Sequence, residues 1–309
     1  MISILSACQL IFLIRVRQKM NSMSVIEKLA ETYPQLYLNP DSTGKEAYRK
    51  VVLEGAVPEV KDLSHFEQDV MDREETVETP AGKVQVISLR NRKDYETFVR
   101  CMMAAKEGPE KPIPASQGAS TLVVFNWPRI NEHKREYLEA QLAAGVSEPD
   151  WSAEFQRFIS VRENYQDLLV VLSWGPYSNI TAEQAGQPEE SWPETSYTIR
   201  KYHELTHVIC RRLYPDRIEA VWDELVADAI GIYAAFGKYD AELEKLFLGI
   251  SEGQYTGGRL ENYTDDAQRL AIEAGKMLDQ FSEIIGDRQT EPFDLIPVLQ
   301  EYQSAFRQA

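Results

Sequence analysis

The chain has 309 residues, which corresponds to about two domains at roughly 150 residues per domain. Apolar residues make up 43% and charged residues 27%, a profile typical of a globular protein and not of a disordered or multi-spanning one. Because 49 acidic side chains outnumber 33 basic ones, the net charge is −16. The chain as a whole lacks the positive charge that nucleic acids and anionic membranes attract, so we expect neither as a partner.

The cysteines and the N-terminal residues indicate the compartment. Cys8, Cys101 and Cys210 are far apart and form no CxxC pair, which argues against a disulfide framework and favours the cytoplasm. The apolar run 2–14 is shorter than the roughly 20 residues that span a bilayer, and basic residues follow it rather than precede it. We interpret residues 1–22 as an upstream extension and expect no stable membrane insertion. Membrane association through residues 1–19 is the alternative.

The first part of the chain, residues 23–187, predicts a mixed α/β lobe. Val25, Ile26 and Leu29 share a helical face, and a second helix is expected to end at Gly55. The acidic stretch 72–78 indicates a solvated loop or face. The remaining expected elements are strands over 83–89, 121–125 and 167–173, and helices over about 93–105, 131–144 and 151–161.

The second part, residues 188–309, predicts an all-helical lobe, because no convincing strand pattern follows Ser191. The polar stretch 181–187 marks the boundary. The expected helices cover about residues 193–214, 217–236, 240–248, 265–285 and 292–306. The predicted fold class is therefore α+β, a mixed lobe with a small sheet followed by a helical lobe.

The first helix of the second lobe contains His203-Glu204-Leu205-Thr206-His207, which fits H-E-x-x-H. Histidines four residues apart lie on one face of a helix, so both imidazoles can reach one metal ion. Glu204 lies about 100° around the helix from His203, close enough to hold a metal-bound water without being a ligand. A chance match is improbable, since the chain has only four histidines.

The next predicted helix contains Glu224 and Asp228, which are again four residues apart and share a face. Asp228 has apolar neighbours on both sides, and a buried carboxylate is costly unless it is paired or close to a metal. We interpret Glu224 as the third Zn²⁺ ligand, with Asp223 and Glu219 as rivals, and Asp228 as the acceptor that orients a ligating histidine. Two histidines, one glutamate and a water would complete a catalytic zinc site.

These two motifs resemble the signature of the gluzincins, the thermolysin-like zinc metallopeptidases. His203, Glu204 and His207 match H-E-x-x-H, and Glu224 with Asp228 match the E-x-x-x-D of the following helix. The resemblance implies a peptidase in which Glu204 activates a zinc-bound water for attack on a peptide or protein substrate. It also implies a zincin-like fold, with the active-site cleft between a mixed lobe and a helical lobe. It covers only about 26 residues of the chain.

The sequence departs from the gluzincin pattern in two respects. Sixteen residues, 208–223, separate His207 from Glu224, slightly fewer than is usual in that group. No histidine follows His207, so the downstream histidine that many thermolysin-like enzymes use to stabilise the oxyanion is absent. Tyr255, Arg259 and Tyr263, around a Gly-Gly turn, are the candidates for that role, and an ordinary surface turn is the alternative interpretation.

A second class of function stays open. A non-catalytic protein could keep the zinc site as a structural or partner-binding module. The presence of Glu204 argues against this, because a purely structural site needs no general base. The sequence determines neither the substrate and the position of cleavage nor the oligomeric state.

Overall fold

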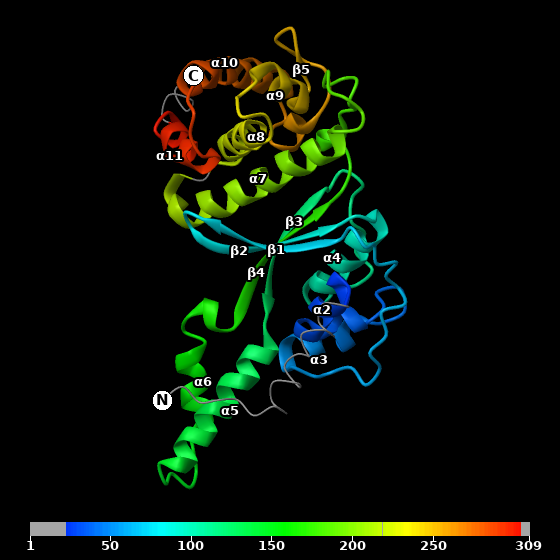
Figure 1. Ribbon diagram of the computed structural model, residues 1–309, viewed down its shortest axis with the longest axis vertical. Helices are drawn as coiled ribbons and strands as arrows, with labels where there is room; N and C mark the ends of the chain where they lie inside the picture. The colour runs from blue at the N-terminus through cyan, green and yellow to red at the C-terminus, as the bar shows by residue number, and fades with distance from the viewer. Residues whose placement is uncertain (1–22, 218, 304–309) are drawn as a thin grey trace, which may run out of the picture. The chain divides into compact units, whose positions relative to one another are not determined.

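The computed structural model describes residues 23–217 and 219–303, and it shows an α+β protein with a small sheet and several helices (Figure 1). The interpretation of residues 1–22 lies outside these residues, as does the end of the helix expected over 292–306. Within the described ranges, no helix combines the length and the apolar character needed to cross a membrane.

The chain forms two compact units that alternate along the sequence. Unit 1 contains the described residues up to Glu74, with Leu89–Ile113 and Leu122–Leu168. Unit 2 contains Glu75–Ser88, Pro114–Thr121 and the chain from Leu169 onward. The boundary predicted at 187/188 falls inside unit 2.

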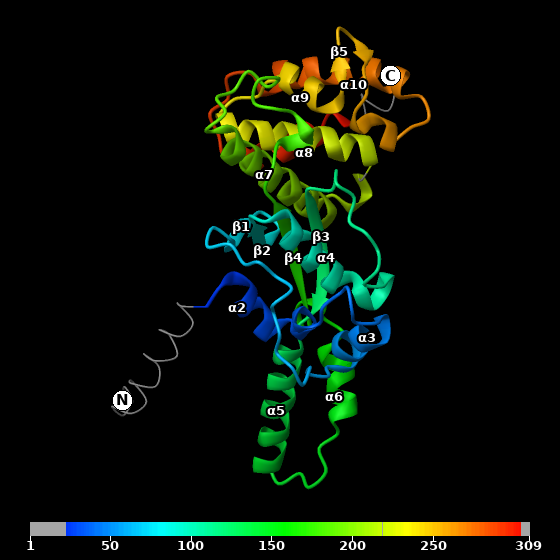
Figure 2. The ribbon, with the colours of Figure 1, turned by 90° about the vertical axis from the view of Figure 1, so that its right-hand side faces the viewer.

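Unit 1 is built mainly from helices. Ser24 begins α2 with a capping box, in which its hydroxyl accepts from the Glu27 N–H and the Glu27 carboxylate accepts from the Ser24 N–H. Helices α5 and α6 lie side by side as a hairpin (Figures 1 and 2). The helices of unit 1 are α2 (Val25–Thr32), η1 (Pro34–Tyr37), α3 (Lys45–Glu54), α4 (Arg92–Glu107), α5 (Trp127–Ala143), α6 (Trp151–Phe158) and η2 (Arg162–Asn164).

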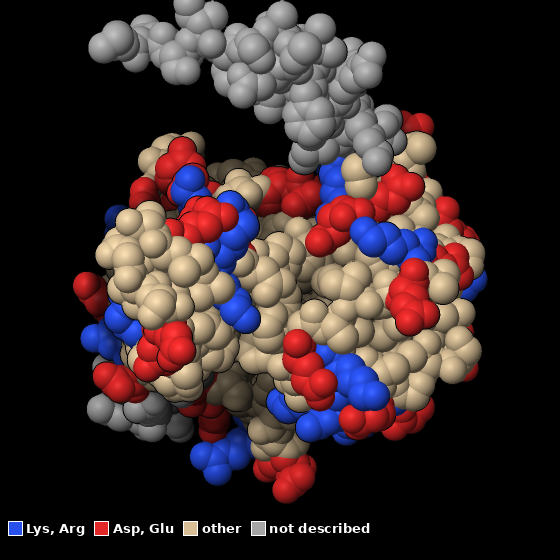
Figure 3. Space-filling model, turned by 90° about the horizontal axis from the view of Figure 1, so that it is seen from below, with Lys and Arg blue, Asp and Glu red and all other residues tan. Residues whose placement is uncertain are grey.

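Charged side chains of both signs are interspersed over the face of the molecule shown in Figure 3. Exposed ion pairs occur among the described residues, such as Arg135 with Glu132 and Glu139 on α5. Pairs of this kind contribute little to stability because water and salt screen them.

Four strands form one sheet in the order β1-β2-β4-β3. Hydrogen bonds from the Ser173 N–H to the Gly118 carbonyl and from the Asn126 N–H to the Tyr165 carbonyl pair opposite ends of β3 and β4, so these strands are antiparallel. The strands are β1 (Arg73–Thr79), β2 (Gly82–Leu89), β3 (Ala119–Phe125) and β4 (Gln166–Ser173). Three of them confirm the strands predicted from β-branched runs.

Strand β1 shows that the acidic stretch 72–78 is a solvated face, as one of the two interpretations had it, and not a loop. Its residues alternate between half-buried and exposed, which is the pattern of a strand with one face in water. It lies at an edge of the sheet, where charged side chains are tolerated and discourage pairing with other chains. The high charge of the segment concealed the two-residue period.

Unit 2 contains the remaining helices. Helices α7 and α8 lie along each other in both views of the ribbon (Figures 1 and 2), and α8 is buried over most of its length. Trp222 of α8 packs edge to face against Phe281 of α10, with ring centroids 5.4 Å apart. The helices are η3 (Tyr177–Asn179), α7 (Trp192–Leu213), η4 (Pro215–Arg217), α8 (Ala220–Phe236), α9 (Ala241–Leu248), η5 (Arg259–Asn262), α10 (Ala267–Ile285), η6 (Pro292–Asp294) and α11 (Leu295–Gln300).

A short hairpin interrupts the segment that was predicted to be all helical, so this prediction was wrong there. β5 (Ile250–Ser251) and β6 (Gln254–Tyr255) pair in antiparallel fashion. Glu252 and Gly253, with φ of 50° and 73°, form the turn, as a tight two-residue hairpin requires. Strands of two residues are too short to show alternation in the sequence.

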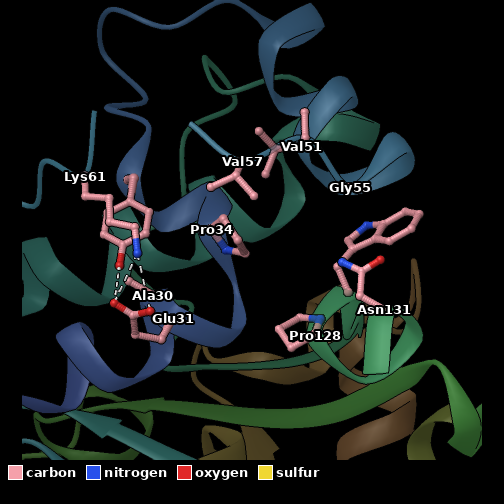
Figure 4. A pocket seen from close by; sticks show the side chains of 12 residues that line it. Ala30, Glu31, Pro34, Val51, Gly55, Val57, Lys61, Pro128 and Asn131 are labelled. Atoms are coloured by element: carbon pink, nitrogen blue, oxygen red, sulfur yellow. Dashed lines mark hydrogen bonds and ion pairs between the residues drawn. The ribbon is translucent and has the colours of Figure 1, made fainter. Parts of the chain in front are cut away.

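Gly55 ends α3 and frames a pocket of about 230 Å³ in unit 1 (Figure 4). It has a left-handed φ of 73°, and a Cβ added to it would lie 2.6 Å from the indole of Trp127. The indole N–H donates to the Val52 carbonyl at 2.8 Å, which fixes the ring against the end of the helix. At one side of the pocket Glu31 and Lys61 form an ion pair at 3.4 Å.

We expect Gly55→Ala to destabilise the protein by about 1–3 kcal/mol, because alanine is strained at this φ and its methyl group would collide with Trp127. Gly275→Ala is the matched control, since Gly275 lies within α10 and a Cβ there would meet nothing within 4 Å. The control should gain about 0.5–1 kcal/mol from helix propensity. Urea unfolding measures both, and equal effects of the two changes would contradict the expectation.

Candidate metal centre

Helices α7 and α8 approach closely because α8 has a glycine at the contact. A Cβ added to Gly231 would lie 2.7 Å from the backbone carbonyl oxygen of Ile199 on α7. Only glycine fits at such a contact without moving one of the helices. Ile199 lies one turn before His203, and Gly231 lies about one turn after Asp228. The contact therefore brings the two sequence motifs face to face.

His203, His207 and Glu224 direct their ligand atoms toward a common point. The two Nε2 atoms are 2.9 Å apart. The Glu224 carboxylate oxygens lie 3.6 Å from His203 Nε2 and 3.5 Å from His207 Nε2. Ligands bound tetrahedrally at 2.0–2.1 Å from a zinc ion are about 3.3 Å apart, so these distances are close to what a metal ion needs. All three ligand atoms lie within 4.8 Å of one another.

The second ring nitrogen of each histidine is hydrogen-bonded to a buried aspartate. His203 Nδ1 lies 2.7 Å from Asp228 Oδ1, and His207 Nδ1 lies 2.6 Å from Asp223 Oδ2. Because an ionised carboxylate can only accept, each Nδ1 carries a proton, and each Nε2 can present a lone pair to a cation that displaces any proton it holds. Both lone pairs then face the same point, which is an arrangement that suits a cation.

The two rivals of Glu224 have other partners. Asp223 points to the far side of the His207 ring. Glu219 caps α8, where its carboxylate accepts from the Val221 and Trp222 N–H groups. The structure thus brings Glu224 to the two histidines, and it gives Asp223 the same relation to His207 that Asp228 has to His203.

Burial and charge act in opposite directions on the titration of the site. Burial acts to raise the pKa of Asp228, but the charges of Arg259 and His203 lower it to about 2. Burial acts to lower the pKa of His207, but the hydrogen bond that its ring donates to Asp223 and the charges of the neighbouring carboxylates raise it to about 9. The Asp228 carboxylate therefore stays ionised at neutral pH, and the protonated form of His207 is favoured in the metal-free protein.

Arg259 and Tyr263, from η5 and the residue that follows it, reach the cluster. Arg259 Nη2 donates to Asp228 Oδ2, and its Nη1 lies 3.6 Å from Glu224 Oε2. Burial and the charge of Glu224, together with a hydrogen bond to that carboxylate, raise the pKa of Tyr263. The surface-turn interpretation therefore does not hold for these two residues. Tyr255 does not reach the cluster, because its hydroxyl donates to the Gly258 carbonyl within the turn at 2.7 Å.

Glu204 lies outside the three-residue cluster. Its carboxylate accepts from the Thr121 hydroxyl of β3 at 3.3 Å, and the residue is half-buried. Glu204 thus remains within reach of water, while the two histidines of the motif, His203 and His207, are buried.

Tyr177 is the residue of the site that the sequence did not predict. Its hydroxyl donates to Asp228 Oδ1 at 2.5 Å and lies 2.8 Å from His203 Nδ1. It precedes these residues by 51 and 26 positions and belongs to a one-turn helix, η3. No local spacing links a tyrosine after a Gly-Pro turn to motifs on two later helices, so no signal in a single sequence could have identified it.

The sequence matches a family of unknown function (DUF7005) over residues 14–290. Since this range is most of the chain, the protein belongs to that family. The matched range includes all the residues of the candidate metal centre. Comparisons with curated proteins and with solved structures found no match.

The buried ion pair of Asp228 and Arg259 should be essential for stability. Arg259→Met keeps the length of the side chain but leaves the Asp228 carboxylate, which is fully buried, without its cation. We expect this change to destabilise the metal-free protein by about 3–5 kcal/mol in urea unfolding at pH 7. In wild type the contribution of Asp228 should be complete above its ordinary pKa of 3.8 and disappear as the pH falls toward about 2.

Arg269→Met is the matched control for this prediction. Arg269 also pairs with a carboxylate, Glu273, at 2.8 Å, but its side chain is 73% exposed. An exposed pair contributes about 0–1 kcal/mol, so the control should be nearly neutral. A similar loss of stability in both variants would contradict the special role of the buried pair.

Proposed function

We propose that the protein is a zinc-dependent metallohydrolase, specifically a peptidase similar to the gluzincins. The observation that carries the proposal is the convergence of His203 Nε2, His207 Nε2 and a Glu224 oxygen on one point. Two histidines and a glutamate from neighbouring helices are the protein ligands of thermolysin-type zinc sites, which keep a further coordination position for the reaction. The chemistry of the donor set fits zinc, since both imidazoles present Nε2 and are oriented by carboxylates.

The residues around the cluster can carry out the proton transfers of peptide hydrolysis. A bound zinc ion would act as a Lewis acid toward water and the substrate carbonyl. The Glu204 carboxylate takes a proton from the attacking water as its oxygen bonds to the carbonyl carbon. Glu204 then gives this proton to the amide nitrogen as the C–N bond breaks. The second proton of the water also passes to the amine, so that one water is consumed and a carboxylate and an ammonium group are released.

The proposal includes a zincin-like arrangement around the cleft. Its support is the contact of Thr121 with Glu204, which brings the start of β3 next to the helix with the histidines. Among the described strands β3 has one neighbour, β4, so it lies at an edge of the sheet, the kind of position at which an extended peptide can add a strand. The net charge of −16 also favours a peptide over a nucleic acid as substrate.

Glu204→Gln tests the general base. We expect this variant to bind zinc as wild type does but to lose about 10²–10⁴-fold in turnover, because glutamine cannot accept the proton. His203→Ala should lose the metal, since a ligand is removed. Elemental analysis of the purified chain gives the metal content, and a peptide library gives turnover.

The same variants separate the proposal from its alternative. A non-catalytic zinc module would show bound metal in wild type and no turnover of any peptide, and Glu204→Gln would then change nothing. Full activity of Glu204→Gln would refute the assignment of the base. A wild-type chain without metal would refute the zinc site itself.

Tyr263 is our candidate to stabilise the oxyanion, because its hydroxyl is next to Glu224 at the cluster. Tyr263→Phe should lower kcat by about 10²–10³-fold, as the loss of an oxyanion donor does in other hydrolases, while metal content and KM change little. Tyr255→Phe is the matched control and should be fully active, since that hydroxyl bonds within its own turn. Equal kcat values for the two variants would exclude Tyr263 from this role.

A further inference from the structure

We propose that Tyr177 is a positioning residue of the metal centre. Its hydroxyl holds the Asp228 carboxylate in place, and the carboxylate in turn holds the His203 ring with Nε2 toward the common point. The inference rests on the proposed metal site, and it adds a residue to which neither the motifs nor the family match assigns a role.

A single carboxylate oxygen receives both donors. Asp228 Oδ1 accepts from the Tyr177 hydroxyl at 2.5 Å and from His203 Nδ1 at 2.7 Å. The other oxygen, Oδ2, accepts from Arg259. The carboxylate cannot rotate without breaking charge-assisted hydrogen bonds, so the ring bonded to it has one favoured orientation.

Packing fixes the position of the Tyr177 ring. The residue is buried, and its ring meets Phe247 edge to face with centroids 4.9 Å apart. It also meets the His203 ring edge to face, with centroids at 5.9 Å. The Tyr177 main-chain N–H donates to the Ser196 hydroxyl of α7 at 3.1 Å. A ligand orientation that depends on such a side chain is well determined, because the supporting residue has little freedom of its own.

The backbone around Tyr177 is held equally firmly. Arg200 of α7 is buried and donates to the carbonyl oxygens of Gly175 and Pro176 at 3.3 Å and 3.2 Å. The next two residues, Ser178 and Asn179, have left-handed φ values of 50° and 60°. Such conformations are unfavourable for residues other than glycine and persist where the surroundings impose them. The residues packed around this segment therefore hold its backbone, and with it Tyr177, in a conformation that is unfavourable on its own.

Tyr177→Phe removes the hydroxyl and keeps the ring. Phenylalanine fills the same space, so the packing against Phe247 is retained, while Asp228 Oδ1 loses one of its two donors. We expect the dissociation constant for Zn²⁺ alone to increase about 10–100-fold, the effect of losing a partner that orients a metal ligand. The Co²⁺-loaded full-length chain should also show shifted visible absorption bands, because the geometry at the metal changes.

Tyr233→Phe is the matched control. Tyr233 is a buried tyrosine of α8, the helix that contains Glu224, and its hydroxyl donates to the Arg288 carbonyl at 2.7 Å. It lies outside the hydrogen-bond network of the cluster, so this variant loses a comparable hydrogen bond without touching the metal site. Its Zn²⁺ affinity and Co²⁺ spectrum should match those of wild type. A chelator competition assay measures the affinities.

The outcomes separate this inference from the proposed function. If wild type binds Zn²⁺ tightly and Tyr177→Phe has the same affinity and the same Co²⁺ spectrum, Tyr177 is not a positioning residue. If wild type itself binds no Zn²⁺, the metal site fails and the role of Tyr177 fails with it. Should Tyr177→Phe not fold, Ser196→Ala releases the Tyr177 main chain instead, and unchanged Zn²⁺ affinity in that variant would overturn the inference.

Discussion

The candidate centre depends on one backbone contact, the approach of Gly231 on α8 to the Ile199 carbonyl on α7. His207 and Glu224 belong to different helices, and their distance is decided by how closely the helix axes approach. A larger residue at 231 would push the helices apart near the Asp228 hydrogen bond to His203, which requires an atom separation of 2.7 Å. The hydrogen bonds and ion pairs of the site therefore depend on the absence of a side chain at Gly231, a residue that takes no part in them.

The contact concentrates negative charge. Four carboxylates, those of Glu204, Asp223, Glu224 and Asp228, lie on the facing helices, and Arg259 is the cation that pairs with two of them. Each aspartate accepts a hydrogen bond from a histidine ring, so a carboxylate orients each ring. This excess of negative charge around two imidazole rings is favourable for a divalent cation.

Sequence and structure agree where a clear helical or strand period relates the residues. His203, Glu204 and His207 could be predicted together because one helical turn relates them, and the same holds for Glu224 with Asp228. Tyr177 could not, since it comes from a short 3₁₀ segment whose place depends on the tertiary fold. Arg259 was named as a candidate for the oxyanion role, but its pairing with Asp228 depends on the tertiary fold in the same way. In the fold, buried β-branched strands were predicted correctly. The edge strand β1 was not, because its residues are nearly all charged or polar and show no alternation of apolar and polar side chains. The hairpin β5-β6 was not, because strands of two residues are too short to show such an alternation.

The alternation of the two units along the chain limits how this site can be moved between proteins. Tyr177 precedes α7, and Thr121 belongs to a still earlier strand of the same unit. A fragment cut at 187/188 would keep both helical motifs and lose the hydroxyl groups that contact Asp228 and Glu204. The helical half moved alone into another protein would therefore lack the contacts of Tyr177 with Asp228 and of Thr121 with Glu204.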